Sequence, residues 1–302
     1  MPARCHAKLA RTDSNSSQIN LSKTIAALWV SRIDALSFVN PKAIPQFADA
    51  DTIAEQLGNE GCNTPLIGIV GNLKGAQRAR PFPHIHYLGF PYSISPTFLE
   101  KNIQSEPQQA LRRLLDIQEE ADNHGKKTLV YLSMAFGNPY QDPWSPSILM
   151  DAIGQLVENG FQEINISDTT GVATSEVLKS SFQDLATAFP HVHFGAHLHV
   201  RTSNTMQNLQ AAWDGGCRIF DSAILGFGGC PVTADNLTGN LATETLMDFL
   251  QNQGLRLKIH KNEFNSAISL ASHTFIWTHH SLFPKYLFDR VFSSIFSYLR
   301  LS

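Results

Sequence analysis

Residues 162–200 read QEINISDTTGVATSEVLKSSFQDLATAFPHVHFGAHLHV, and this stretch has the pattern of a strand, a helix and a second strand. Its two ends, 162–168 and 193–200, are rich in β-branched and apolar residues, whereas 175–190 has helical spacing. The helical part carries one apolar stripe and stops at a proline, as shown by Val177, Leu178, Phe182, Leu185, Phe189 and Pro190. This pattern predicts two parallel strands joined by a crossover helix.

The same alternation runs through most of the chain. Runs that read as strands occupy 32–38, 66–71, 84–90, 128–136, 162–168, 193–200 and 217–225, and 105–125 reads as another crossover helix. Seven such strands, with helices between them, predict an α/β fold of the (β/α)₈ TIM-barrel type rather than an open sheet. An eighth strand should precede residue 32, but no strand pattern is found there. We therefore expect the first strand to be missing or aberrant.

Composition narrows the class of protein. The 302 residues with 43% hydrophobic content suit one large domain, and a formal net charge of -3 gives no basic surface for nucleic acid. No window reaches the roughly 18 apolar residues of a membrane span. Four scattered cysteines without a CxxC pair favour neither a disulfide framework nor a structural zinc site. We expect a cytoplasmic protein; a mitochondrial one is the alternative, because residues 1–18 resemble a transit peptide.

His197 and His199 lie two residues apart in the predicted strand 193–200. Side chains at such positions share one face of a strand, so both imidazoles can reach one cation. Active sites of such barrels lie at the carboxyl ends of the strands, where these residues fall. By itself the pair fits buried or surface histidines as well as metal ligands.

A glycine-rich segment follows the last predicted strand. Residues 224–244 read ILGFGGCPVTADNLTGNLATE, and four glycines and a proline around Cys230 describe a loop that can fold over a ligand. Cys230 is therefore a candidate acid or base; a small buried thiol is the alternative.

Two aspartates are further candidates for proton transfer. Asp168 ends a predicted strand and precedes a turn, so it could orient a substrate, relay a proton or cap the next helix. Asp34 lies among apolar residues of the earliest predicted strand and needs a partner if it faces inward; a structural ion pair is the alternative. Lys74 and Arg78 could attract a phosphate-bearing thioester or simply begin a solvated helix.

Six motifs in chain order carry a family resemblance: SFVNPKAIPQ (37–46), GNLKGA (71–76), SDTTGVAT (167–174), GAHLHV (195–200), GFGGCP (226–231) and LTGNLATE (237–244). Together they resemble the 3-hydroxy-3-methylglutaryl-CoA lyase family, which lies among metal-dependent barrels that also include isopropylmalate and homocitrate synthases. The resemblance covers about residues 32–271.

The resemblance implies a divalent metal, Mg²⁺ or Mn²⁺, held by His197, His199 and Asn240 together with an aspartate of the first strand. It implies cleavage of 3-hydroxy-3-methylglutaryl-CoA to acetyl-CoA and acetoacetate. By analogy Cys230 protonates the enolate, and Asp168 and Asp34 match acidic positions of the family's site. An acyl-CoA thioester is then the partner, and a homodimer is one assembly open to the chain.

The family's first strand carries an Arg-Asp pair within Cys-Pro-Arg-Asp-Ala-Met-Gln, and this chain lacks it. Arg11 and Asp13 stand nearby in a segment without strand character, so we do not assign them the roles. Synonymous codons for MPARCHAK, read one nucleotide later, encode that heptapeptide. We therefore interpret about residues 2–32 as an out-of-frame reading and expect weak metal binding and little turnover; the gene's codons decide this.

We divide the chain into an aberrant segment (1–31), a barrel domain (32–271) and a tail (272–302). In the tail, an apolar pattern predicts an amphipathic helix that includes Leu287, Val291, Phe292, Ile295, Phe296 and Leu299. Two other functions stay open, namely a condensing synthase of the same superfamily and a non-catalytic barrel that binds a CoA ester.

Overall fold

The computed structural model describes residues 20, 30–42, 44, 47–59, 64–200, 204–228, 239–257, 261–276 and 296–300. Its strands are β1 (Arg32–Ser37), β2 (Leu66–Ile69), β3 (Ile85–Ser93), β4 (Lys127–Ser133), β5 (Glu163–Asp168), β6 (His193–Val200), β7 (Ile219–Ser222), β8 (Gly239–Asn240) and β9 (Phe296–Arg300). Its α-helices are α2 (Ala50–Asn59), α3 (Leu73–Ala79), α4 (Pro96–Ile103), α5 (Pro107–Asn123), α6 (Pro146–Glu158), α7 (Ser175–Ala188), α8 (Thr205–Asp214), α9 (Thr243–Asn252) and α10 (Lys261–Ile276).

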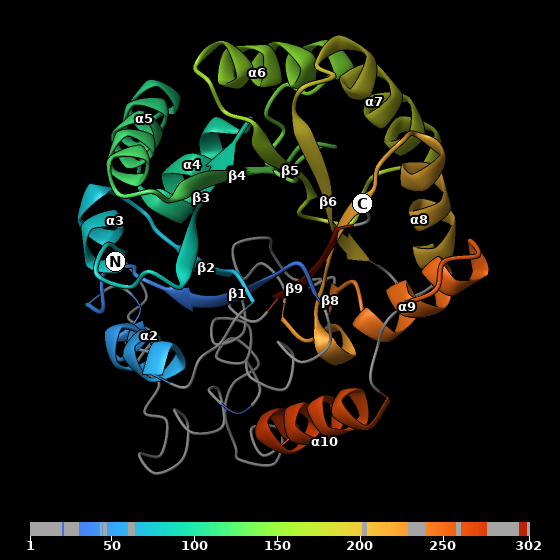
Figure 1. The fold of residues 1–302 in the computed structure, drawn as a ribbon. Helices are drawn as coiled ribbons and strands as arrows, with labels where there is room; N and C mark the ends of the chain where they lie inside the picture. Colours follow the sequence, from blue (N-terminus) through green and yellow to red (C-terminus); the bar gives the residue numbers. More distant parts are fainter. Residues whose placement is uncertain are drawn as a thin grey trace.

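Strands β1 to β7 form a curved sheet in which sequential neighbours pair in parallel. Helices lie outside the sheet and surround it, as Figure 1 shows in a view down the barrel. The expected α/β barrel and all seven expected strands are confirmed, with ends shifted by a few residues. Helix α7 begins where expected because the Thr174 hydroxyl accepts a hydrogen bond from the Val177 amide, a typical N-cap.

Strand β9 fills the gap between β1 and β7. It pairs antiparallel with both, so that Tyr298 lies opposite Arg32 on one side and opposite Asp221 on the other. The sheet thereby closes into an eight-stranded barrel, because β5 also pairs with β6. The expected barrel with a missing or aberrant first strand is confirmed, since among the described residues a late segment occupies the place between β1 and β7 and runs in the opposite direction.

The same strand corrects the expectation for the tail. Residues 296–300 are a strand and not part of an amphipathic helix, while α10 continues to Ile276. Phe296 and Leu299 of the predicted helical pattern thus belong to β9, and the other four residues of that pattern lie outside the described residues. Because β9 pairs with both β1 and β7, neither of these two strands is left as an unpaired edge.

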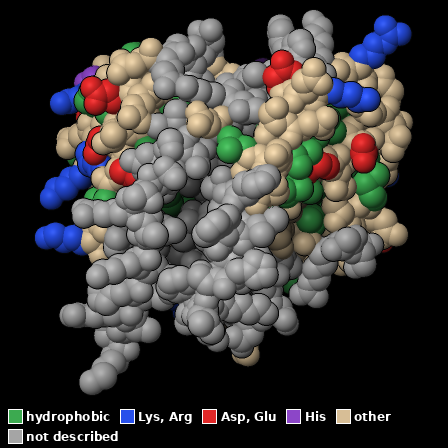
Figure 2. All heavy atoms as spheres, turned by 90° about the horizontal axis from the view of Figure 1, so that it is seen from below, with side chains coloured by type: hydrophobic (Ala, Val, Ile, Leu, Met, Phe, Trp, Pro, Cys, Tyr) green, Lys and Arg blue, Asp and Glu red, His purple; other side chains and the backbone are tan. Residues whose placement is uncertain are grey.

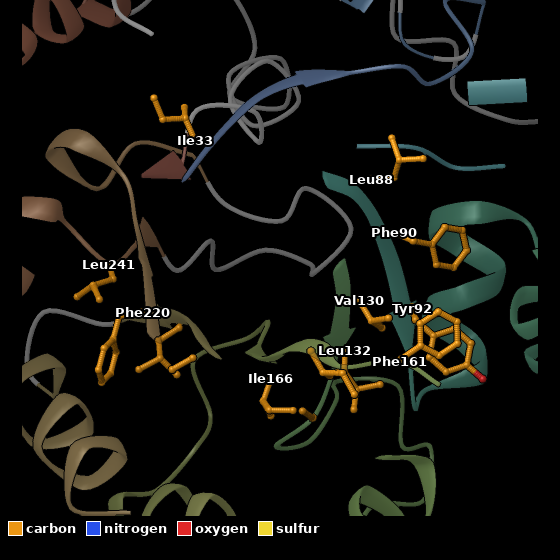
Figure 3. Packing of buried hydrophobic residues seen from close by; sticks show 14 of the residues in the cluster. Ile33, Leu88, Phe90, Tyr92, Val130, Leu132, Phe161, Ile166, Phe220 and Leu241 are labelled. Carbon is orange, nitrogen blue, oxygen red and sulfur yellow. The ribbon is translucent and has the colours of Figure 1, made fainter. Parts of the chain in front are cut away.

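The main hydrophobic core lies between the strands and the surrounding helices. Alternate residues of the strands point to it, among them Ile33, Phe90, Ile166 and Phe220, all fully or almost fully buried. Figure 3 shows Phe90 grouped with Tyr92 and Phe161 on the helix side of β3. The barrel interior must therefore receive the other alternate side chains of each strand, and many of these are polar.

A buried ion pair illustrates this polar interior. Arg32 of β1 donates from Nη2 to Glu163 Oε2 of β5 at 2.8 Å, and His193 Nδ1 lies 3.1 Å from the other carboxylate oxygen. Burial raises the pKa of Glu163, but the charge and hydrogen bond of Arg32, with His193, outweigh it and hold the pKa below its ordinary value. The pair links two strands on opposite sides of the barrel.

We expect Glu163→Gln to lower the free energy of unfolding by about 1–3 kcal/mol at pH 7, because the buried Arg32 guanidinium then loses its charged hydrogen-bond acceptor at 2.8 Å. A lowered pKa in the folded state stabilises the protein above the unfolded pKa, and this contribution disappears as the pH falls through the folded pKa. Urea unfolding at pH 7 and at about pH 3 measures both effects. The exposed Glu158→Gln in α6 is the matched control, and equal losses in the two variants would contradict the prediction.

Candidate active site

His197 and His199 meet at the carboxyl end of β6. Their Nε2 atoms lie 3.3 Å apart, so both rings point at one place. The Tyr131 ring from β4 packs edge-on against His197, with centroids 5.8 Å apart, and adds an apolar wall. Because strand ends form the mouth of such a barrel, the two imidazoles stand where ligands bind in this fold.

The His197 ring has a carboxylate behind it, because its Nδ1 lies 2.9 Å from Oδ2 of Asp221 on β7. His199 Nδ1 is buried without a hydrogen bond from the described residues, although the Thr169 backbone lies close enough to affect its pKa. The Asn165 amide of β5 donates to both oxygens of Asp221, at 3.0 and 2.8 Å. Asp221 and Asn165 were not identified from the sequence, although Asp221 shares with Asp34 the signal of a carboxylate inside an apolar strand.

Burial keeps His199 neutral. Desolvation, followed by the neighbouring His197 ring, lowers the pKa of His199 to about 3, and the Thr169 backbone only partly offsets this. An imidazole must be neutral to bind a metal through a ring nitrogen, so His199 is in the required form at physiological pH.

Asn240 joins the two histidines through a short strand. β8 pairs antiparallel with β6 in a register that puts Asn240 opposite His199. The Asn240 amide donates from Nδ2 to the Phe227 carbonyl at 2.7 Å, which leaves its side-chain oxygen as the candidate ligand. Gly226, with a φ of +65°, lies where a Cβ would come within 2.9 Å of the Asn240 carbonyl, so glycine is required there. The three expected metal ligands are thus brought together.

This donor set fits a divalent cation. Neighbouring nitrogen ligands of an octahedral cation with bonds of about 2.1 Å lie about 3 Å apart, close to the Nε2 separation of His197 and His199. Two imidazoles and an amide oxygen suit a metal of borderline to hard character. Within the described ranges, no group of three or more His, Cys, Asp or Glu side chains could hold a metal, so no carboxylate ligand joins the three.

Asp34 lies inside the barrel on β1. It is 1% exposed, and its Oδ1 accepts no hydrogen bond from the described part of the chain. Burial, and then the charge of Asp221, raises the pKa of Asp34 well above its ordinary value. No ion pair of Asp34 is found among the described residues, and its role in proton transfer stays a prediction.

We expect Asp34→Asn to stabilise the fold, and more so at high pH. A raised folded-state pKa means that stability falls as the pH rises from about 4 towards that pKa, because the buried group must then ionise. The variant has no carboxyl group to ionise at this position. Its free energy of unfolding should therefore exceed that of the wild type by an amount that increases with pH to the order of 1 kcal/mol or more. Urea unfolding at pH 5 and pH 9 measures it, with the exposed Asp151→Asn as control; an advantage that shrinks with pH contradicts the expectation.

Asp168 anchors a turn. Its Oδ1 accepts from the Val172 amide and its Oδ2 from the Ala173 amide, both at 3.0 Å. Burial raises the pKa of this carboxyl despite those bonds. The side chain thus holds the loop after β5, where the Thr169 backbone reaches His199. Its two oxygens are engaged by the backbone, which favours an orienting role over direct proton relay.

The remaining candidates divide into two groups. Cys230, Arg11 and Asp13 lie outside the described residues. Arg78 forms an ion pair with Asp51 and donates to the Val39 carbonyl, whereas Lys74 at the start of α3 is exposed. Arg78 therefore stabilises the loop after β1 and not, by these contacts, an anionic ligand.

The charges on the surface and the hydrophobicity of the helices are relevant to binding of nucleic acid and of membranes. On the face drawn in Figure 2, acidic and basic side chains are interspersed around the periphery. Among the described residues, no helix is long and apolar enough to cross a bilayer.

The closed α/β barrel carries histidine, amide and carboxylate side chains at the ends of its strands. Enzymes with this fold have their active sites at the carboxyl ends of the strands, so the fold and the site define an enzyme of the α/β-barrel class. Residues 12–271 match the family described as HMGL-like, and the chain belongs to this family. The match begins within the predicted aberrant segment 1–31. Relatives of this chain are lyases that cleave carbon–carbon bonds.

Two relatives and one structure show the extent of the likeness. The chain is 30% identical over 241 residues to the mitochondrial hydroxymethylglutaryl-CoA lyase of Pongo abelii, covering 79% of this chain and 72% of the relative. It is 27% identical to a 3-hydroxy-3-isohexenylglutaryl-CoA/hydroxy-methylglutaryl-CoA lyase of Pseudomonas aeruginosa, with 77% of each covered. An HMG-CoA lyase from Acinetobacter baumannii, in complex with coenzyme A and 3-methylmalate, superposes with a TM-score of 0.78 at 25% identity, covering 86% and 84%.

Proposed function

We propose that this chain binds a divalent cation, Mg²⁺ or Mn²⁺, through His197, His199 and Asn240 and acts on 3-hydroxy-3-methylglutaryl-CoA. The products are acetyl-CoA and acetoacetate, and turnover is slow. The observation that carries the proposal is the convergence of the two Nε2 atoms, 3.3 Å apart, beside Asn240. Membership of a family of acyl-CoA lyases supports the substrate class.

When bound, the cation supplies Lewis-acid chemistry that makes the substrate's tertiary hydroxyl more acidic. The chain's own groups handle the protons. Asp34, with one oxygen that accepts no hydrogen bond from the described residues, is our candidate acceptor of the hydroxyl proton in its ionised form, which its raised pKa makes a stronger base. The carbon–carbon bond then breaks to a ketone and a thioester enolate, and we assign Cys230, by family analogy, as the donor that protonates the enolate carbon. Asp168 orients the loop beside the site.

We expect slow turnover because this chain lacks the Arg-Asp pair that the family's first strand carries. That strand carries an Asp for the metal and an Arg for the enolate oxygen, and here β9 runs antiparallel in the gap between β1 and β7. No carboxylate joins the histidines among the described residues. A cation held by fewer charged ligands is held more weakly, and an enolate without the Arg of the family's first strand is stabilised less.

An assay of acetoacetate release from 3-hydroxy-3-methylglutaryl-CoA, with and without Mg²⁺, tests the proposal. Slow release that requires the cation supports it. Rates equal to those of an ordinary lyase contradict slow turnover. Binding of the thioester without any release favours a non-catalytic CoA-ester barrel, and condensation of acetyl-CoA with a keto acid favours a synthase. The cytoplasmic location and a homodimer stay predictions.

A further inference from the structure

Asp221 stands directly behind the candidate metal ligand His197. Its carboxylate is 2% exposed on β7, and Oδ2 lies 2.9 Å from His197 Nδ1. A carboxylate can only accept a hydrogen bond, so the proton of a neutral His197 belongs on Nδ1 when Asp221 is ionised. The Nε2 lone pair of His197 then points towards His199.

Asn165 fixes Asp221 in turn. Its amide nitrogen donates to both carboxylate oxygens, which holds the plane of the carboxylate relative to the imidazole ring. Gly195 on β6 makes room for this arrangement, because a Cβ at that position would lie 2.4 Å from Asn165 Oδ1. Gly195 thus lies on β6 between Asn165 of β5 and Ile219 of β7, where a Cβ would contact both side chains.

We propose that Asp221, held by Asn165, is a positioning residue that fixes the Nδ1–H tautomer of His197 and so presents its Nε2 to the cation. The inference rests on the proposed metal site for its consequence, whereas the tautomer itself exists without any metal. An outer carboxylate partner of a histidine ligand typically changes metal affinity by about 10- to 100-fold.

The first measurement is the tautomer in metal-free protein, read from ¹⁵N chemical shifts of the His197 ring. We expect a protonated Nδ1 and an unprotonated Nε2. In Asp221→Asn the new amide can donate to Nδ1, so we expect the proton to move to Nε2. A wild-type His197 with its proton on Nε2, or no change of tautomer in a folded Asp221→Asn chain, overturns the proposal.

The second measurement is Mn²⁺ binding by the full chain, followed by electron paramagnetic resonance of the free ion. Asp221→Asn should bind about 10- to 100-fold more weakly, and Asn165→Ala and Gly195→Ala should weaken binding in the same direction but less. The exposed Asp184→Asn in α7 is the matched control and should bind as the wild type does. Circular dichroism confirms that each variant is folded; if Asp221→Asn is not, Asn165→Ala decides.

The two measurements separate the proposals. If the wild type binds no Mn²⁺ while His197 has its proton on Nδ1 in an Asp221-dependent way, the metal site fails and the positioning role of Asp221 stands. If the wild type binds Mn²⁺ and Asp221→Asn retains both tautomer and affinity, the positioning role fails and the metal site stands.

Discussion

A chain carrying His199→Ala should bind Mn²⁺ about 100-fold more weakly than the wild type, because one of the two converging ring nitrogens is lost outright. Losing only an outer partner of a metal ligand already costs about 10- to 100-fold. His199 is buried and neutral, with a pKa of about 3, so protons do not compete for its nitrogen near pH 7. Titration calorimetry at pH 7 measures the change.

The control for this variant is His191→Ala. His191 is exposed and lies just before β6, at the opposite end of the strand from His199. Wild-type Mn²⁺ affinity is expected for it. If His199→Ala, shown to be folded, kept the affinity of His191→Ala, the two histidines would not form a metal site and the proposed function would fall with them.

Tyr298→Pro should reduce the free energy of unfolding by more than about 3 kcal/mol. Tyr298 lies in the middle of β9, with β1 on one side and β7 on the other. Proline removes the backbone N–H and is tolerated essentially only in edge strands, so it cannot serve in this position. Loss of β9 would leave β1 and β7 as open edges that can pair with other chains.

Tyr298→Ala is the matched control, since it removes the side chain and keeps the backbone N–H. Thermal and urea unfolding, with light scattering to detect association, compare the two variants. A Tyr298→Pro chain as stable and as monomeric as Tyr298→Ala would mean that β9 does not close the barrel in solution.

Local patterns predicted the seven parallel strands because strand and helix periods differ and repeat along the chain. The alternation of side chains on a strand likewise placed His197 and His199 on one face. Neither argument depends on which strands are neighbours, and this is why both are confirmed by the structure.

Strand β9 was mispredicted because a five-residue apolar segment fits a strand as well as the end of a helix. The choice is made by its pairing with β1 and β7, and β1 lies more than 250 residues earlier in the sequence. The pairing of Asp221 with Asn165 and His197 has the same origin, since these side chains come from three strands whose register the sequence alone does not reveal.

The place of β9 sets an order of events during synthesis. At about 5–20 residues per second, β1 is complete on the order of 10–50 s before the ribosome has made residues 296–300. During that interval β9 has not yet been synthesised and cannot pair with β1. The barrel therefore closes only after nearly the whole chain has been translated. Premature termination shortly before residue 296 should therefore harm yield far more than the few lost residues suggest.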